Sequence, residues 1–341
     1  MEREGREDRP RALTSGQAAQ SKAVALAGAV AVVAGARGMT PWARSTALPT
    51  IAYPKVFVVG CPRSGTTWVN TILEGHPRVV GGRESHLYPT ICGLMATQGR
   101  FSVKAWARLL YGVERGARLG RGAGVHNYVD RPTLARLGRG VLAEARSDDE
   151  AADRLIRAVL DSHFSNARGT SDDVLVEKTP FHIFHAERIL STFPEARLVE
   201  VVRDGRDVCV SMQMRAQRVP AFPTSREGQI DLWVRSVRHG LAVRRNPDFR
   251  DRVTVVRYED LKADTVVETK RLFTAVGLDA PAELVAGAVD ATDVSRLRTG
   301  PGEFHHRGEV GTWVDHFSAD DERQFHARVG DLFTQIGYAY D

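Results

Sequence analysis

The sequence is poor in cysteine, and its few cysteines form no recognisable framework. There are three in 341 residues, and their spacing fits neither a set of disulfides nor a metal-binding motif. Cys61 and Cys209 lie beside the motifs described below, where we expect them to be small buried residues. A disulfide-stapled secreted domain is therefore excluded, and a reducing, cytoplasmic compartment is the natural expectation.

Long hydrophobic runs are also missing. The apolar stretch near the N-terminus, an Ala/Val/Gly segment at 23–36, is flanked by Lys22 and Arg37. It is too short for a membrane span, which needs roughly 18 or more apolar residues. The residues before it are charged and polar, which favours disorder. We therefore expect residues 1–50 to be a disordered or loosely docked tail, with no firm membrane association.

Aromatic residues make up only 7% of the chain, and few of them lie among the arginines scattered through 100–168. Single-strand nucleic-acid binders combine aromatic and basic side chains, so we expect no nucleic-acid partner. The net charge of +5 is better explained by a solvated helical surface, although it also suits an anionic nucleotide. With 43% hydrophobic residues, the chain can bury the core of one large domain.

A lysine is missing from the most informative motif of the chain. Residues 56–67, VFVVGCPRSGTT, read as an apolar strand, a glycine-rich turn and the start of a helix. Gly60 and Gly65 keep the spacing of the phosphate-binding pattern G-x-x-x-x-G-K-[ST], and Thr67 takes its hydroxyl position, but Thr66 stands where the lysine belongs. The loop therefore suits an anion bound by backbone amides, but it is poorly equipped for ordinary ATP chemistry.

A second strand-to-helix turn supplies an arginine. An apolar strand at 198–202 ends in Arg203 and turns through Asp204 into a helix that contains Ser211. The forked guanidinium of Arg203 and the hydroxyl of Ser211 can converge on one anion if the turn is tight. The alternative is a helix-capping turn, with Asp204 as the N-cap and a solvated arginine.

Strands alternate with helices after residue 51. This alternation predicts an α/β fold, a P-loop-type parallel sheet with helices on both faces, and ligands beyond the carboxyl ends of the strands. Residues 87–169 read as a mostly helical insertion with glycine-rich breaks at 118–124. The expected strands are 56–59, 79–80, 174–176, 198–202 and 253–256, and the expected helices are 66–73, 183–193, 206–219 and 264–276.

Together, these motifs resemble the sulfotransferases that use 3′-phosphoadenosine 5′-phosphosulfate (PAPS) as donor. The resemblance implies a sulfotransferase domain at 51–341, in which the helical insertion at 87–169 forms the acceptor side. It implies that Arg203 and Ser211 hold the 3′-phosphate. It also implies a loop for the 5′-phosphosulfate made by Pro62, Arg63, Ser64, Gly65, Thr66 and Thr67.

Three further segments fit this family. VRYEDL at 256–261 looks like its strand-then-YED segment, which places Tyr258 near the adenine. HRGEVGTW at 306–313 resembles a late loop of pattern R-K-G-x-x-G-x-W that closes over the nucleotide, so Arg307 and Gly308 carry over as nucleotide-binding residues. EKTPF at 177–181 is similar to the lysine segment of tyrosylprotein sulfotransferases and their bacterial relatives.

The same resemblance implies the catalytic residues. Lys178 and Arg63 serve the transferring oxygens, without a metal. Glu84 lies in GRESHLYP, which resembles the segment that carries the catalytic glutamate of tyrosylprotein sulfotransferases. Cytosolic members use a histidine two residues after the equivalent lysine, where this chain has Pro180. His182 and His86 are therefore reserve candidates for the base, and Glu84 is the favoured one.

We expect sulfuryl transfer from PAPS by in-line displacement to a hydroxyl or amine acceptor, which can be a small molecule, a glycan or a peptide. An atypical P-loop kinase is the first alternative. It is disfavoured by Thr66 and by the lack of a metal-binding carboxylate directly after the strand at 198–202. A catalytically silent nucleotide-binding protein is the second, and the presence of both Lys178 and Glu84 argues against it.

Overall fold

The computed structural model describes residues 52–98, 102–120, 122–216, 222–292 and 308–340. The described chain separates into two compact units. The sheet unit comprises residues 53–81 and 169–341, and the helical unit comprises residues 82–168. The expected tail at 1–50 and the binding residue Arg307 lie outside the described residues, and so do the last three residues of the helix expected at 206–219.

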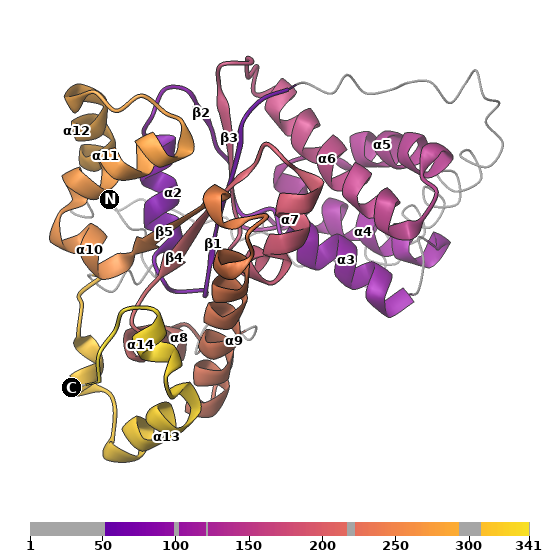
Figure 1. The fold of residues 1–341 in the computed structure, drawn as a ribbon. Coiled ribbons are helices and arrows are strands. Elements are labelled where there is room, and N and C mark those ends of the chain that lie inside the picture. The colour runs from indigo at the N-terminus through magenta and orange to yellow at the C-terminus, as the bar shows by residue number, and fades with distance from the viewer. Residues whose placement is uncertain (1–51, 99–101, 121, 217–221, 293–307, 341) are drawn as a thin grey trace, which may run out of the picture. The chain divides into compact units, whose positions relative to one another are not determined.

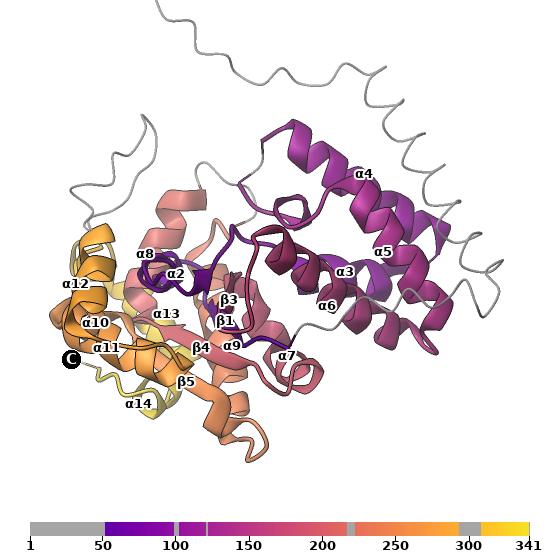
Figure 2. The same cartoon turned by 90° about the horizontal axis from the view of Figure 1, so that it is seen from above.

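The sheet unit is built on five parallel strands, which confirms the predicted fold class (Figures 1 and 2). The strand order is β2-β3-β1-β4-β5, with β1 at the centre. Every pairing is parallel, so the carboxyl ends of the strands share one edge. The strands are β1 (Lys55–Gly60), β2 (Val79–Val80), β3 (Val174–Lys178), β4 (Arg197–Val202) and β5 (Val253–Arg257).

Alternate residues of the strands are buried against helices on both faces. Val56 and Val58 of β1 pack in one core with α2 (Thr66–Glu74), α11 (Thr265–Val276) and α12 (Ala282–Ala291). On the other face, α7 (Ala186–Thr192) contacts β4 and α9 (Arg226–Arg245) contacts β1. A second core joins α9 to α8 (Gly205–Ala216), α13 (Ala319–Val329) and α14 (Leu332–Gln335).

One predicted helix begins later than expected. Instead of a helix from residue 183, a 3-10 segment, η2 (Pro180–His185), precedes α7. The turn starts after an extended Thr179 and is closed by the amide of His182, which donates to the Thr179 carbonyl at 2.9 Å. The short turn carries the His182 ring back to Glu177 in β3, with Nδ1 2.7 Å from Oε2. This buried contact explains why the segment does not continue as a regular α-helix.

The helical unit confirms that the insertion is mostly helical. Serine or aspartate side chains cap three of its helices, namely Ser102, Asp130 and Ser147. The predicted glycine-rich break follows α4, where Gly120 and Gly124 have positive φ. The elements are α3 (Leu87–Gln98), α4 (Val103–Arg118), η1 (Val125–Asn127), α5 (Arg131–Glu144) and α6 (Asp148–Asn166). Within the described ranges, no helix of either unit is both long and apolar enough to cross a membrane.

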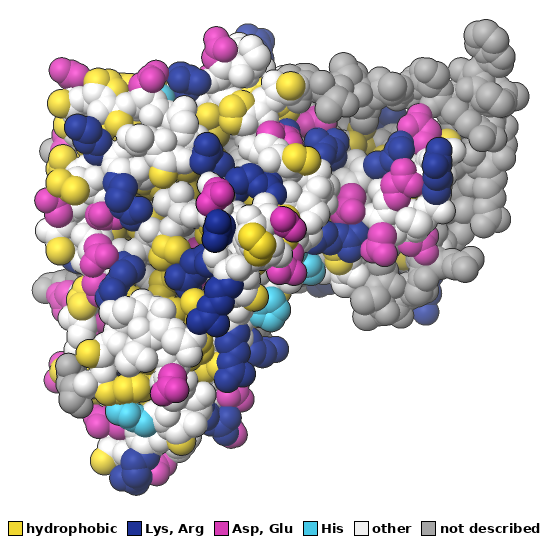
Figure 3. Space-filling view, viewed as in Figure 1, with side chains coloured by type: hydrophobic (Ala, Val, Ile, Leu, Met, Phe, Trp, Pro, Cys, Tyr) yellow, Lys and Arg dark blue, Asp and Glu magenta, His cyan; other side chains and the backbone are white. Residues whose placement is uncertain are grey.

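Cys61 and Cys209 are buried, as expected for small core residues. Burial raises the pKa of the Cys209 thiol to about 12, so this thiol is protonated and unreactive at neutral pH. In the sheet unit, positively charged side chains gather along α9, as Figure 3 shows, and on this helix these side chains are all arginines. Part of the positive charge therefore lies on this helix, and not only in the segment 100–168. The compartment remains a prediction.

One carboxylate is buried between the sheet and α9. Glu200 in β4 faces Gly240 of α9, and a side chain at Gly240 would overlap its carboxylate. Arg244 places Nε 3.1 Å from Glu200 Oε2. Burial raises the pKa of the Glu200 carboxyl from 4.5 to about 7, although Arg244 opposes this shift. The folded chain therefore keeps a proton that the unfolded chain releases.

We expect the stability of the wild type relative to Glu200→Gln to fall as the pH rises from 4.5 to about 7. In this window the folded state binds more protons than the unfolded state, so raising the pH favours unfolding of the wild type. Gln cannot titrate and lacks this dependence. Melting temperatures of both proteins across the window test the expectation, which a constant difference between them would contradict.

Candidate functional site

The turn between β1 and α2 is tightly wound. The Ser64 amide donates to the Cys61 carbonyl at 3.1 Å, and Arg63 and Gly65 both have positive φ, 76° and 98°. A positive φ is unusual for arginine, and such conformations concentrate at functional sites. Two features require glycine at position 65. Its φ lies in the left-handed region, and a side chain there would overlap the ring of Tyr258.

The Ser64 hydroxyl is the least satisfied group in this turn. Ser64 is only 1% exposed, and its Oγ has no hydrogen-bond partner in the described part of the chain. Burying an unpaired hydroxyl costs about 1–3 kcal/mol. The turn also leads into the N-terminus of α2, where unpaired amides and the helix dipole favour negative charge. An anion bound here would accept hydrogen bonds from the Ser64 hydroxyl and from the amides at the start of α2. The turn therefore fits the predicted phosphate loop.

Two cations flank the loop. Lys178 lies at the end of β3, whose parallel register pairs it with Val58 of β1. Its Nζ donates to Thr67 Oγ1 at 3.3 Å. Arg63 donates from Nε to the Ser211 hydroxyl on α8 at 3.1 Å. The structure therefore brings four predicted site residues into two pairs beside the loop. Lys178 pairs with Thr67, and Arg63 pairs with Ser211.

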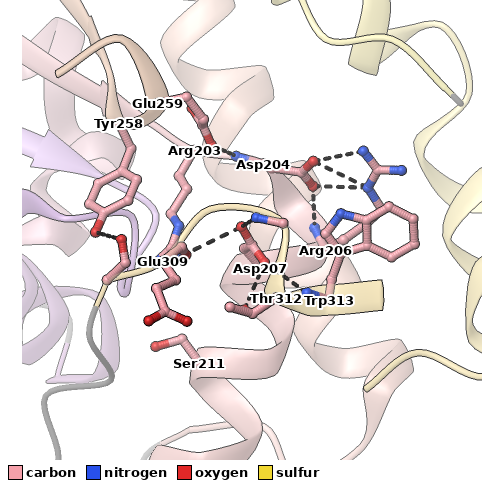
Figure 4. Close-up of polar contacts among 12 residues, drawn as sticks. Arg203, Asp204, Arg206, Asp207, Ser211, Tyr258, Glu259, Glu309, Thr312 and Trp313 are labelled. Carbon is pink, nitrogen blue, oxygen red and sulfur yellow. Dashed lines mark hydrogen bonds and ion pairs between the residues drawn. The ribbon is translucent and has the colours of Figure 1, made fainter. Parts of the chain in front are cut away.

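Arg203 follows β4 and is buried. It is only 8% exposed, so the alternative of a solvated arginine is wrong. Its guanidinium stacks over the Tyr258 ring at 4.3 Å, and Nη2 donates to the Glu309 carbonyl at 2.9 Å (Figure 4). Its buried Nε has no hydrogen-bond partner among the described residues. The capping half of that alternative is right, because Asp204 Oδ1 accepts from the Arg206 amide at 2.8 Å.

Tyr258 links the end of β5 to the segment at 308–313, called the late segment below. Its hydroxyl donates to the Gly308 carbonyl at 2.7 Å, and its ring makes an edge contact with Trp68 of α2 at 5.5 Å. Burial raises the pKa of the phenol, so Tyr258 stays neutral at physiological pH. Tyr258, Gly308 and Arg203 therefore lie together, although they come from three separate motifs.

The sequence analysis missed Asp207, which holds the late segment in place. This carboxylate is 1% exposed and accepts three hydrogen bonds, from the Gly311 amide at 2.8 Å, the Thr312 hydroxyl at 3.0 Å and the Trp313 amide at 3.0 Å (Figure 4). It also lies 3.6 Å from Nη2 of Arg203. Asp207 lies in the first turn of α8, four residues after Arg203, and no sequence pattern identified it.

Glu259 is a second missed carboxylate. Its Oε1 accepts from the Asp204 amide at 2.9 Å, and its Oε2 accepts from the Tyr338 hydroxyl at 2.5 Å. The residue follows Tyr258 directly and therefore ties the end of β5 to the turn after β4. It supports the geometry of that turn and does not add a cation or a donor for a ligand.

The remaining candidates divide between the two units. In the helical unit, Glu84 Oε2 lies 3.1 Å from His86 Nε2, and the two side chains are 28% and 29% exposed. Glu84 is thus paired with a histidine two residues later in the same segment. In the sheet unit, His182 and Glu177 are both 0% exposed, which leaves His182 no access to a ligand. No group of side chains suited to a metal ion was found among the described residues.

We expect Asp207→Asn to lower the free energy of unfolding by at least about 2 kcal/mol, because hydrogen bonds to a charged group contribute roughly 1.5–3 kcal/mol each. The amide keeps one acceptor oxygen but turns its NH2 group toward other donors. Urea unfolding measures the loss. Asp320→Asn is the matched control, since Asp320 is exposed and pairs with Arg323 on the surface, where such pairs contribute little. Equal losses in both variants would contradict the role of Asp207.

Three comparisons with known proteins agree on one family. A family model described as "Sulfotransferase family" matches residues 54–282. Protein-tyrosine sulfotransferase A of Caenorhabditis elegans is 28% identical over 169 residues, which cover 50% of this chain and 35% of that protein. Human protein-tyrosine sulfotransferase 1 is 28% identical over 177 residues, 51% of this chain and 38% of that protein. The chain thus aligns with only about a third of the length of these relatives.

A solved structure supports the fold over the whole chain. The crystal structure of a sulfotransferase from Mycobacterium avium superposes with a TM-score of 0.50 and 14% identity, covering 98% of this chain and 99% of that one. At this identity the likeness concerns the fold alone. The family is therefore shown by the match of the family model over residues 54–282.

Proposed function

Since the chain belongs to the sulfotransferase family, we propose that it transfers a sulfuryl group from PAPS to a hydroxyl or amine acceptor. Arg203 is the observation that carries this choice of donor. A 3′-phosphate distinguishes PAPS from ATP and AMP, and a guanidinium is the side chain best suited to bind phosphate through paired hydrogen bonds. Arg203 is buried, held over Tyr258, and has a donor at Nε without a partner in the described residues.

The loop between β1 and α2 fits the other end of the donor. The buried Ser64 hydroxyl and the amides at the start of α2 would hold the 5′-phosphosulfate, with Arg63 and Lys178 as the nearby cations. When bound, the donor supplies an activated sulfuryl group. This group carries one negative charge, fewer than a terminal phosphoryl group, so these two cations and the amides are enough to balance it. The proposal therefore assigns no role to a metal.

We assign the base to Glu84. A general base must be accessible to the proton that it takes, and the Glu84 side chain is 28% exposed whereas His182 is completely buried. His86, 3.1 Å away, would orient the carboxylate and stabilise its negative charge. The curated relatives are named for acting on protein tyrosine.

We expect Arg203→Ala to remove most of the preference for adenosine 3′,5′-bisphosphate over AMP. A charge-assisted hydrogen bond contributes roughly 1.5–3 kcal/mol, so the affinity for the bisphosphate should fall about ten- to hundredfold. Affinity for AMP should change little. Titration calorimetry of both nucleotides checks the result. Arg197→Ala is the control, because Arg197 is an exposed arginine at the opposite end of β4. Equal binding of the two nucleotides by the wild type would refute the assignment.

We expect Glu84→Gln to cut turnover by about 10²–10⁴, which is the usual contribution of a general base. The amide keeps the shape and can still contact His86, but it cannot accept a proton. Nucleotide affinity should stay unchanged. Steady-state transfer of labelled sulfate measures the effect, with Glu144→Gln as control, because Glu144 is an ion-paired carboxylate of the same unit. If Glu84→Gln loses stability but keeps its rate, the residue is only a structural partner of His86.

A further inference from the structure

The helical unit contains a cavity of its own. It lies between α3, α4 and the loop that leads into η1, and its volume is about 570 Å³. This volume is within the range of small-molecule binding sites. Apolar side chains such as Leu94, Leu109 and Val113 line much of it, together with four polar side chains, those of His86, Thr90, Arg108 and His126.

Two helical glycines keep this cavity open. Gly93 of α3 and Gly112 of α4 both line it, and a Cβ at either position would have no atom within 4 Å. Glycine inside a helix is less stable than alanine by about 1 kcal/mol, and no steric constraint requires it at either position. Larger side chains here would extend into the open space, so these residues preserve the volume of the cavity.

One wall of the cavity is joined to the proposed base. His86 lines the cavity, and its Nε2 lies 3.1 Å from Glu84 Oε2. Gly124 also lines it, and the Gly124 amide donates to the Glu84 carbonyl at 2.7 Å. His86 has a φ of 50°, a conformation that non-glycine residues seldom adopt and that the surrounding structure must hold. The cavity and the carboxylate are therefore fixed to each other within a single unit.

We propose that this cavity holds the apolar body of a small-molecule acceptor, an alcohol or a phenol, whose hydroxyl group lies at the His86 end. The inference rests on the proposed function and names its acceptor class. Apolar walls favour a hydrophobic ring system by roughly 25 cal/mol for each Å² buried. The four polar side chains of the cavity are too few to pair with the many hydroxyls of a glycan, and unpaired buried hydroxyls are costly. An extended peptide of about six residues spans roughly 20 Å, and a cavity of about 570 Å³ would hold only part of it.

A binding experiment tests the cavity without activity. The probe is 2-naphthol, a phenol with two fused apolar rings whose fluorescence reports its surroundings. We expect the full chain to bind it, and we expect Gly112→Leu to weaken binding at least about tenfold. Gly140→Leu is the matched control, because Gly140 lies in α5, outside the cavity lining, and its Cβ would also meet nothing within 4 Å. Gly93→Leu is a second cavity-filling variant.

The outcomes are distinct. Loss of binding in both cavity variants, with the Gly140→Leu control and the melting temperature unchanged, supports the proposal. It is overturned if the wild type does not bind 2-naphthol, or if Gly112→Leu and Gly93→Leu bind it as the wild type does.

Transfer assays separate this inference from the proposed function. With PAPS as donor, 2-naphthol should be sulfated, and Gly112→Leu should raise its KM without changing the affinity for adenosine 3′,5′-bisphosphate. If a tyrosine-containing acidic peptide is sulfated instead and the cavity variants do not affect this, the acceptor class is wrong while the proposed function holds. If the chain does not bind the bisphosphate at all, the proposed function fails, and 2-naphthol binding still reports on the cavity.

Discussion

The site in the sheet unit depends on the parallel pairing of its strands. Because β3, β1, β4 and β5 run in the same direction, their carboxyl ends meet at one edge. Four segments that are far apart in the sequence leave the sheet there: the loop after Gly60, Lys178, Arg203 and Tyr258. A shift of one residue in any pairing would turn its side chains to the opposite face. The register therefore determines which cations meet the loop.

Burying the cations at this edge of the sheet costs free energy in the absence of a ligand, and it also strengthens their attraction for an anion. Arg203 and Lys178 are 8% and 6% exposed, and charges out of water are strongly disfavoured unless they are paired and hydrogen-bonded. Asp207 near Arg203 and Thr67 at Lys178 supply part of that pairing. Donors still remain at Ser64 and at Arg203 Nε without partners in the described residues. Such a site gains most from an anionic ligand, since binding completes hydrogen bonds that folding leaves open.

The sequence predicts these groups well when the signal is local. The phosphate loop and the strand before Arg203 follow from short motifs, and the alternation of elements predicts the parallel sheet. The support contacts were not predictable in this way. Asp207 bonds to residues more than a hundred positions later, and the late start of α7 depends on a buried contact between His182 and Glu177. Pairings of this kind are set by the fold and leave no periodic pattern.

The two units also show different degrees of constraint. In the sheet unit, Gly60 and Gly65 cannot accept side chains, because backbone or ring atoms already occupy the space and φ is positive. In the helical unit, Gly93 and Gly112 face open space and have no such restriction. A side chain at Gly60 or Gly65 would disrupt the loop itself, whereas a side chain at Gly93 or Gly112 would change only the shape of a cavity. Under the proposed function, the backbone therefore constrains the loop that would bind the donor, whereas single substitutions in α3 and α4 would change the cavity that we propose for the acceptor.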